Sequence, residues 1–276
     1  MIRTRRLAPL ALLACLVLAG TGRADDTPAA VTTENPRFDV LVFSKTAGFR
    51  HGSIPNGIEA VRRLGREHDF TVEATEDAAA FTDENLRRFE VVVFLNTTGD
   101  VLDADQQSAF QRYIQRGGGY AGVHSASDTE YDWPWYGKLV GAYFKGHPRV
   151  QPATVHVTDR THPSTHHLAE KWQRRDEWYD FNASPRGGVR ILARLDESTY
   201  EGGKMGDDHP IAWYHAFDGG RAWYTGGGHT KEAYDEPDFQ KHLLGGIEWS
   251  AGVRDVSASA SAEAEKTGTG DRDGGD

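Results

Sequence analysis

The amino-acid sequence predicts an α/β fold in which helices cover both faces of a doubly wound, mainly parallel β-sheet. Residues 38–44 and 90–95 are continuous apolar runs, which are typical of strands buried on both faces. Strand and helix patterns alternate between residues 38 and 123, and this alternation favours parallel strands joined by helices. After residue 150 the strand patterns become shorter and alternating, so antiparallel strands are expected to extend the sheet. A chain of 276 residues is long enough to bury one large core.

The first strand is expected at residues 38–44, and a helix follows at about residues 53–68. Ser53 is a suitable N-cap for this helix, and Pro55 fits its first turn. The next elements are a strand, a short helix and a strand, at residues 70–74, 82–88 and 90–95.

A second long helix is expected at residues 103–116, because Asp103 and a glutamine three residues later stand in capping-box positions. Residues 117–119 are glycines, which end a helix without a steric clash in the left-handed conformation. Residues 120–123 then form a short apolar strand, and His124 lies in the turn after it.

The second half is expected to add antiparallel strands and a final helix to the sheet. Its first part is an irregular, aromatic segment. His162, His166 and His167 lie in a polar turn and are predicted to be at the surface. The expected strands are at residues 150–157, 188–195, 210–217 and 221–225, and the helix is at 237–249.

The two ends of the chain differ in composition from the folded unit. Residues 1–24 have basic residues, a short apolar run and small residues near Ala24, which predicts a cleaved signal peptide and a secreted or periplasmic protein without a stable membrane span. Residues 25–36 are expected to be a linker, and residues 37–254 a single domain. Residues 255–276 lack aromatic residues and are expected to be a disordered acidic tail.

Cys15 is the only cysteine, and it lies within the predicted signal peptide. The mature protein is therefore expected to lack disulfides, thiolate metal ligands and a cysteine nucleophile. Lipoprotein acylation at Cys15 is not expected, because most of the apolar run would have to follow it. Arg5 and Arg6 leave a twin-arginine export signal as an alternative to an ordinary one.

The charge balance excludes some classes of partner. The formal net charge is −10, and removing the four arginines of residues 1–24 makes it −14. Nucleic acids and anionic membrane surfaces select for clusters of Lys and Arg, so neither is an expected partner.

Polar residues follow several of the predicted strands directly. His51, Asn96, His124 and His229 each come after a strand, and Ser125 follows His124. Because the carboxyl ends of parallel strands meet at one edge of a sheet, the three histidines are expected to converge there.

Two chemistries fit such a site. Glu177 lies in an aromatic stretch and is predicted to join His124, His229 and Ser125 as a catalytic group. His51, His124, His229 and Glu177 could bind zinc or another divalent transition metal. The same groups without a metal could act as general acid and base.

A sugar is the substrate class that the surrounding residues favour. Aromatic side chains beside a polar site suit the apolar faces of sugar rings. The predicted substrate-binding residues are His51, Asn96, Trp135, Trp178, Tyr179 and His209.

Five motifs stand in a fixed order along the chain. They are Val40-Leu41-Val42-Phe43-Ser44 with Gly48-Phe49-Arg50-His51, Gly118-Gly119-Tyr120-Ala121-Gly122-Val123-His124-Ser125, Asp176-Glu177-Trp178-Tyr179, His209-Pro210-Ile211-Ala212-Trp213 and Gly220-Arg221-Ala222-Trp223-Tyr224-Thr225 through Gly228-His229-Thr230. Together these motifs resemble the ThuA-like (trehalose utilisation) domain over about residues 38–251.

The resemblance implies a flavodoxin-like fold related to the class I glutamine amidotransferases, and a role in sugar metabolism. In true amidotransferases the position of His124 carries a cysteine, so the usual thiolate route to glutamine hydrolysis is excluded here. The leading hypothesis is an exported hydrolase, lyase or isomerase acting on a carbohydrate or modified sugar. The alternatives are a non-catalytic glycan-binding module and a hydrolase that uses Ser125 as its nucleophile.

Overall fold

The computed structural model describes residues 37–256. The predicted signal peptide, the linker and residues 257–276 of the predicted tail lie outside the described residues. The main sheet contains β1 (Phe38–Phe43), β2 (Phe70–Thr75), β3 (Val91–Leu95), β4 (Gly119–Val123), β6 (Gln151–Val157), β7 (Lys171–Asp176), β9 (Arg190–Asp196), β10 (His209–Phe217) and β11 (Gly220–Thr225).

The sheet is parallel in one half and antiparallel in the other. Its strand order is β2-β1-β3-β4-β11-β10-β9-β6-β7. The first five strands in this order run parallel, and the remaining four pair antiparallel. The predicted α/β sheet with antiparallel additions is therefore confirmed.

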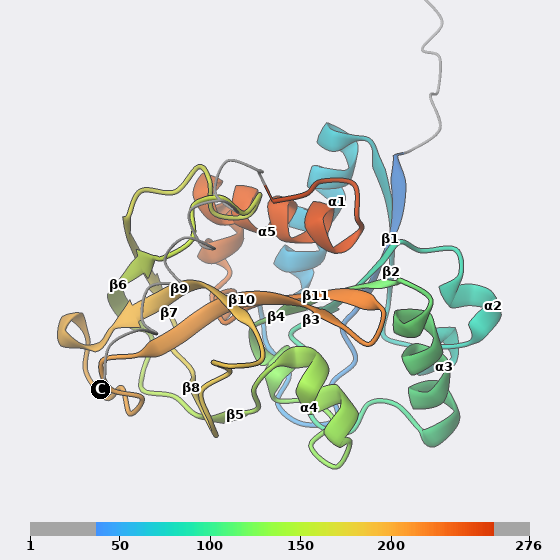
Figure 1. Cartoon of the computed structure of the whole chain (residues 1–276), viewed down its shortest axis with the longest axis horizontal. Helices are drawn as coiled ribbons and strands as arrows, with labels where there is room; N and C mark the ends of the chain where they lie inside the picture. The colour runs from blue at the N-terminus through green and yellow to red at the C-terminus, as the bar shows by residue number, and fades with distance from the viewer. Residues whose placement is uncertain (1–36, 257–276) are drawn as a thin grey trace, which may run out of the picture. The chain divides into compact units, whose positions relative to one another are not determined.

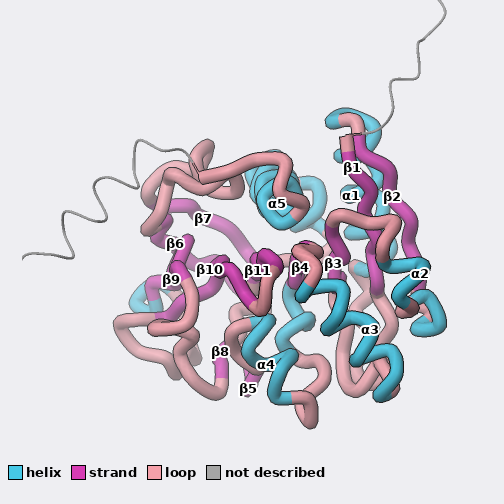
Figure 2. The backbone as a smooth tube through the Cα atoms, turned by 45° about the vertical axis from the view of Figure 1, so that its right-hand side comes forward, coloured by secondary structure: helices cyan, strands magenta, loops and turns pink. Residues whose placement is uncertain are grey.

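Helices cover both faces of the parallel half, as Figures 1 and 2 show. One face carries α1 (Ile54–His68) and α5 (Pro237–Ser250), which contact each other and the central strands. The other carries α3 (Ala104–Gln115) and α4 (Pro134–Val140), and α2 (Asp83–Leu86) packs beside α3. Because both faces are covered, every residue of β3 and β4 is buried.

The two predicted helix starts differ in outcome. Asp103 and Gln106 form the expected capping box at the start of α3. Ser53 stands at the N-cap of α1 but makes no capping bond; its hydroxyl instead donates to the carbonyl of Gly228 and accepts a hydrogen bond from Asn96. Ser53 therefore ties α1 to the loop after β11.

The helix α4 forms within the aromatic segment that the sequence pattern predicts to be irregular. Two strand features were also not expected from the sequence. The first is β7, an edge strand of the sheet, whose sequence KWQRRD lacks the apolar pattern of a strand. The second is a separate antiparallel pair, β5 (Phe144–Gly146) with β8 (Asp180–Phe181), which lies below the main sheet in Figure 1. The remaining elements are short 3₁₀ turns at Ala78–Ala80, His124–Ser127, Glu197–Thr199 and Glu232–Asp235.

The predicted surface position of His162 is wrong. Its side chain is fully buried against Tyr214 and Trp249, whereas His166 in the same turn is exposed. Within residues 37–256, no helix has the length and apolar character needed to cross a membrane.

Candidate functional site

Four side chains from separate segments meet at the carboxyl ends of the parallel strands. His51 follows β1, His124 follows β4, His229 follows β11, and Glu177 follows β7. One nitrogen or carboxylate oxygen of each lies within 4.8 Å of the corresponding atoms of the other three. We call these four residues the His–Glu cluster.

His124 is placed by a strained turn. Its φ of 51° lies in the left-handed region, which is uncommon for a residue with a side chain. The hydroxyl of Tyr224 donates to its carbonyl at 2.7 Å, and its Nδ1 donates to the carbonyl of Gly226 at 2.9 Å. The side chain is fully buried, and its Nε2 faces His229 and Glu177.

Glu177 contacts three imidazoles. Its Oε2 lies 3.0 Å from Nδ1 of His229 and 3.5 Å from Nε2 of His124, and its Oε1 lies 3.0 Å from Nδ1 of His147. Burial favours the neutral carboxyl, but the hydrogen bonds from His124 and His229 outweigh it and lower the pKa of Glu177 to about 2. Glu177 is therefore a buried anion.

The two other histidines respond to burial differently. For His229, burial disfavours the charged ring, but the hydrogen bond to Glu177 outweighs this and raises the pKa. For His51, burial and the neighbouring His124 and His229 lower the pKa to about 3, so its ring is neutral. The hydroxyl of Ser125 lies 3.3 Å from Nδ1 of His51.

The loop of residues 226–229 is held by a buried ion pair. Both oxygens of Asp176 accept backbone N–H groups, one from Gly228 at 2.8 Å and one from His229 at 3.0 Å. Arg174 lies 3.0 Å from the same carboxylate. Asn96 donates to the carbonyl of Gly228 from behind the loop, so it contacts the loop and not the ligand-type atoms of the cluster.

Sequence reasoning did not place His147 in the site, and it included Asp176 only as part of the motif around Glu177. His147 lies just after the short β5, which has no clear strand pattern, and it reaches Glu177 only because β5 pairs with β8. Asp176 immediately precedes Glu177, and this adjacency was the available signal.

Three of the predicted substrate-binding residues, all aromatic, lie differently with respect to the His–Glu cluster. The ring of Tyr179 packs against that of His124, with centroids 4.1 Å apart and ring planes tilted by 35°. Trp178 is buried and donates to the carbonyl of Gln151, so its faces are covered. Trp135 is not beside the histidines: it donates to Asp218, in the turn before β11 begins.

His209 belongs to a second cluster beside the first. Its Nδ1 lies 2.8 Å from Oε1 of Glu197, and its Nε2 lies 2.8 Å from the carbonyl of Tyr179. Asp180 completes this group and accepts the backbone N–H of Lys204. His209 therefore supports the segment that carries Glu177 and Tyr179.

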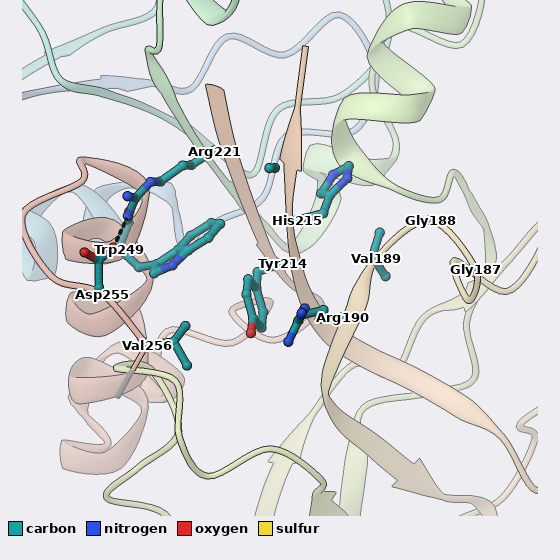
Figure 3. Close-up of a pocket in the computed structure, with 11 residues that line it drawn as sticks. Gly187, Gly188, Val189, Arg190, Tyr214, His215, Arg221, Trp249, Asp255 and Val256 are labelled. Carbon is teal, nitrogen blue, oxygen red and sulfur yellow. Dashed lines mark hydrogen bonds and ion pairs between the residues drawn. The ribbon is translucent and has the colours of Figure 1, made fainter. Parts of the chain in front are cut away.

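A surface groove of about 740 Å³ lies elsewhere on the molecule (Figure 3). It is lined by Tyr214, Trp249 and Arg221, and it contains no member of the His–Glu cluster. Arg221 forms an ion pair with Asp255, and Nε2 of His215 donates a hydrogen bond to the carbonyl of Leu139. Because Arg221, Asp255 and His215 already have partners, we place the chemistry at the His–Glu cluster.

Comparison with solved structures identifies the fold. A ThuA-like protein from Bacteroides uniformis is 25% identical with a TM-score of 0.67, over 79% of this chain and 92% of that one. One from Parabacteroides merdae is 21% identical with the same TM-score, over 81% and 94%. A β-galactosidase from Bacillus circulans is 11% identical with a TM-score of 0.51, covering 78% of this chain but 31% of the enzyme, and shows a shared fold alone.

No curated protein sequence matches this chain significantly. The sequence profile of the family described as "ThuA: Trehalose utilisation" matches residues 39–250, which include all four members of the His–Glu cluster. The chain therefore belongs to the ThuA family.

Proposed function

We propose that this chain is an enzyme that acts on a carbohydrate or modified sugar at the His–Glu cluster. The observation that carries the proposal is the convergence of three imidazoles and one carboxylate at the carboxyl edge of the parallel strands. Gathering buried polar groups opposes folding unless they are well paired, and enzymes concentrate such groups where they perform acid–base chemistry. The family description, trehalose utilisation, supports a sugar as the substrate.

Each member of the site has a proposed role. Without a bound metal ion, His124 and His229 would transfer a proton to or from a sugar hydroxyl or C–H group, and Glu177 would orient them. His51, held by Ser125, would contact the substrate. Proton transfer of this kind is common to hydrolysis, elimination and isomerisation, so all three reaction classes stay within the proposal.

The substrate would approach from the side where the cluster reaches solvent. The side chain of His147 is 40% exposed and that of His229 is 24% exposed. Phe49 is 66% exposed and its ring lies 4.9 Å from that of His51. An exposed aromatic ring beside polar groups suits one face of a sugar.

The test is incubation of the purified chain with trehalose and a panel of other glycosides and modified sugars in D₂O, followed by proton NMR. Hydrolysis releases new anomeric signals, elimination gives a vinyl proton, and isomerisation through a C–H bond incorporates deuterium. We expect His124→Gln and Glu177→Gln to lower turnover by about 10²–10⁴-fold. His166→Gln, an exposed change in a surface turn, should leave turnover unchanged.

The exposed Phe49 also favours a second candidate, a non-catalytic glycan-binding module. Saturable sugar binding without turnover, retained by His124→Gln and lost by Phe49→Ala, would support that module and overturn the enzyme proposal.

We also propose that the protein is exported with cleavage near Ala24. N-terminal sequencing of the secreted or periplasmic protein tests this, and a chain still beginning at Met1 would contradict it.

A further inference from the structure

The ligand-type atoms of His124, Glu177 and His229 form a small triangle. Nδ1 of His229 lies 3.0 Å from Oε2 of Glu177 and 3.3 Å from Nε2 of His124. The third side of the triangle, from Nε2 of His124 to Oε2 of Glu177, is 3.5 Å. A single point can lie about 2.0–2.2 Å from all three atoms, which is the usual distance from zinc to imidazole nitrogen and carboxylate oxygen. The triangle therefore has the size of one face of a metal coordination shell.

The hydrogen bond at the other ring nitrogen of His124 leaves its Nε2 available to a ligand. Because Nδ1 of His124 donates to the carbonyl of Gly226, a neutral His124 presents a lone pair at Nε2. Glu177 presents a carboxylate oxygen. A divalent cation would take the place of the protons through which His124 and His229 hydrogen-bond to Glu177, and it would bind all three atoms.

The outer contacts also match those of metal ligands. Ligating imidazoles usually donate their second nitrogen to a carbonyl or a carboxylate, as His124 does to Gly226. The second oxygen of Glu177 is held by His147 at 3.0 Å. The backbone of His229 is fixed by Asp176. Each vertex of the triangle therefore has a partner that keeps it in place.

We propose that His124 Nε2, His229 Nδ1 and Glu177 Oε2 bind one divalent first-row transition ion, with zinc as the best match to the triangle. Two imidazoles and a carboxylate form a donor set that such ions accept. A ring nitrogen of His51 lies within 4.8 Å of the ligand-type atoms of these three residues. The ion would be the cofactor of the site proposed above. Only its purpose, which is to bind a water or a sugar hydroxyl at the open coordination position, rests on the proposed function.

The neighbouring group of Asp180, Glu197 and His209 provides an internal contrast. Oε1 of Glu197 already accepts the backbone N–H groups of Met205 at 2.8 Å and Gly206 at 3.0 Å. N–H groups directed at a carboxylate occupy the lone pairs that a metal would need. This second cluster is therefore expected not to bind the ion, and it supplies a matched control.

The experiment starts from the full chain, purified without metal-affinity resin, stripped with a chelator and titrated with Zn²⁺ and with Co²⁺. We expect one equivalent of bound metal by plasma mass spectrometry and visible absorption bands from bound Co²⁺. His124→Gln, His229→Gln and Glu177→Gln should each weaken binding by about 100-fold or more, and His147→Gln by about 10–100-fold. Glu197→Gln should retain the full equivalent.

Circular dichroism shows which variants are folded, so that a loss of metal is not a loss of structure. A wild-type chain that binds neither ion would overturn the inference, as would folded triangle variants that bind with wild-type affinity. Metal content and sugar turnover separate this inference from the proposed function. Bound metal without turnover contradicts the enzyme proposal alone, and turnover that survives complete chelation contradicts the metal alone.

Discussion

Asp176 fixes the loop that carries His229, and it does so from a fully buried position. Its carboxylate accepts two backbone N–H groups of that loop and pairs with the buried Arg174. We expect Asp176→Asn to lower the free energy of unfolding by about 1–3 kcal/mol, because the buried Arg174 would keep only its ion pair with Glu236. Urea unfolding of wild type and variant measures the difference.

Asp132→Asn is the matched control, since Asp132 is exposed. A surface change of this kind should alter the unfolding free energy by less than about 0.5 kcal/mol. If Asp176→Asn were as stable as the control, the pairing with Arg174 would not hold the loop.

Single residues of the site could be predicted where they directly follow a strand of the parallel half. His51, His124 and His229 were identified in this way, because topology alone brings such positions together. Trp135 and Trp178 could not be assigned by the same reasoning. An aromatic residue in an irregular segment can face a site, a neighbouring helix or the core, and the sequence pattern does not distinguish these cases.

At the scale of elements, the start of α3 offers a direct test of helix capping. The side chain of Asp103 accepts the N–H groups of Asp105 and Gln106, and Oε1 of Gln106 accepts the backbone N–H of Asp103. We expect Asp103→Ala to lower the free energy of unfolding by about 1 kcal/mol, because these N–H groups lose their acceptor. Thermal and urea unfolding both report this change.

Asp103→Ser is the rescue variant, since serine caps helices nearly as well as aspartate. It should recover most of the lost stability. Equal stability of the alanine and serine variants would show that the side-chain cap contributes nothing.

The elements that the sequence predicted are those with a complete local signal. The capping box and apolar face of α3 are of this kind, as are the apolar runs of β1 and β3. β7 was missed because tertiary contacts stabilise it: Arg174 and Asp176 pair inside the protein, so a charged segment forms an edge strand. No local pattern reports a pairing partner that lies elsewhere in the fold.

At the scale of the whole molecule, the division of the sheet into parallel and antiparallel halves followed from the change in pattern after residue 150. The segments that pack around the His–Glu cluster could not be predicted from this pattern. The pairing of β5 with β8 joins segments about 35 residues apart and brings His147 to Glu177. Long-range pairing of such short strands depends on the packed molecule and not on either segment.

Two buried histidines make the stability of the whole molecule depend on pH. Nδ1 of His162 accepts the N–H of Ser164, and Nδ1 of His242 donates to the carbonyl of the same residue. The Nε2 atoms of both rings are buried without a hydrogen-bond partner among the described residues. Burial, reinforced by nearby cationic groups, lowers the pKa of each ring to about 3.

The sign of the pH effect follows from these values. Between pH 6.5 and about 3 the unfolded chain binds a proton at each histidine that the folded chain does not bind, so stability falls as the pH falls. Each ring should lower the free energy of unfolding by about 2 kcal/mol between pH 7.5 and pH 5.

His162→Gln and His242→Gln each remove one titrating ring, so the unfolding free energy of each variant should fall by about 2 kcal/mol less than that of wild type over this range. His166→Gln, with its exposed ring, should follow wild type. Urea unfolding at several pH values measures these differences, and identical losses in all four proteins would mean that neither buried histidine contributes to acid unfolding.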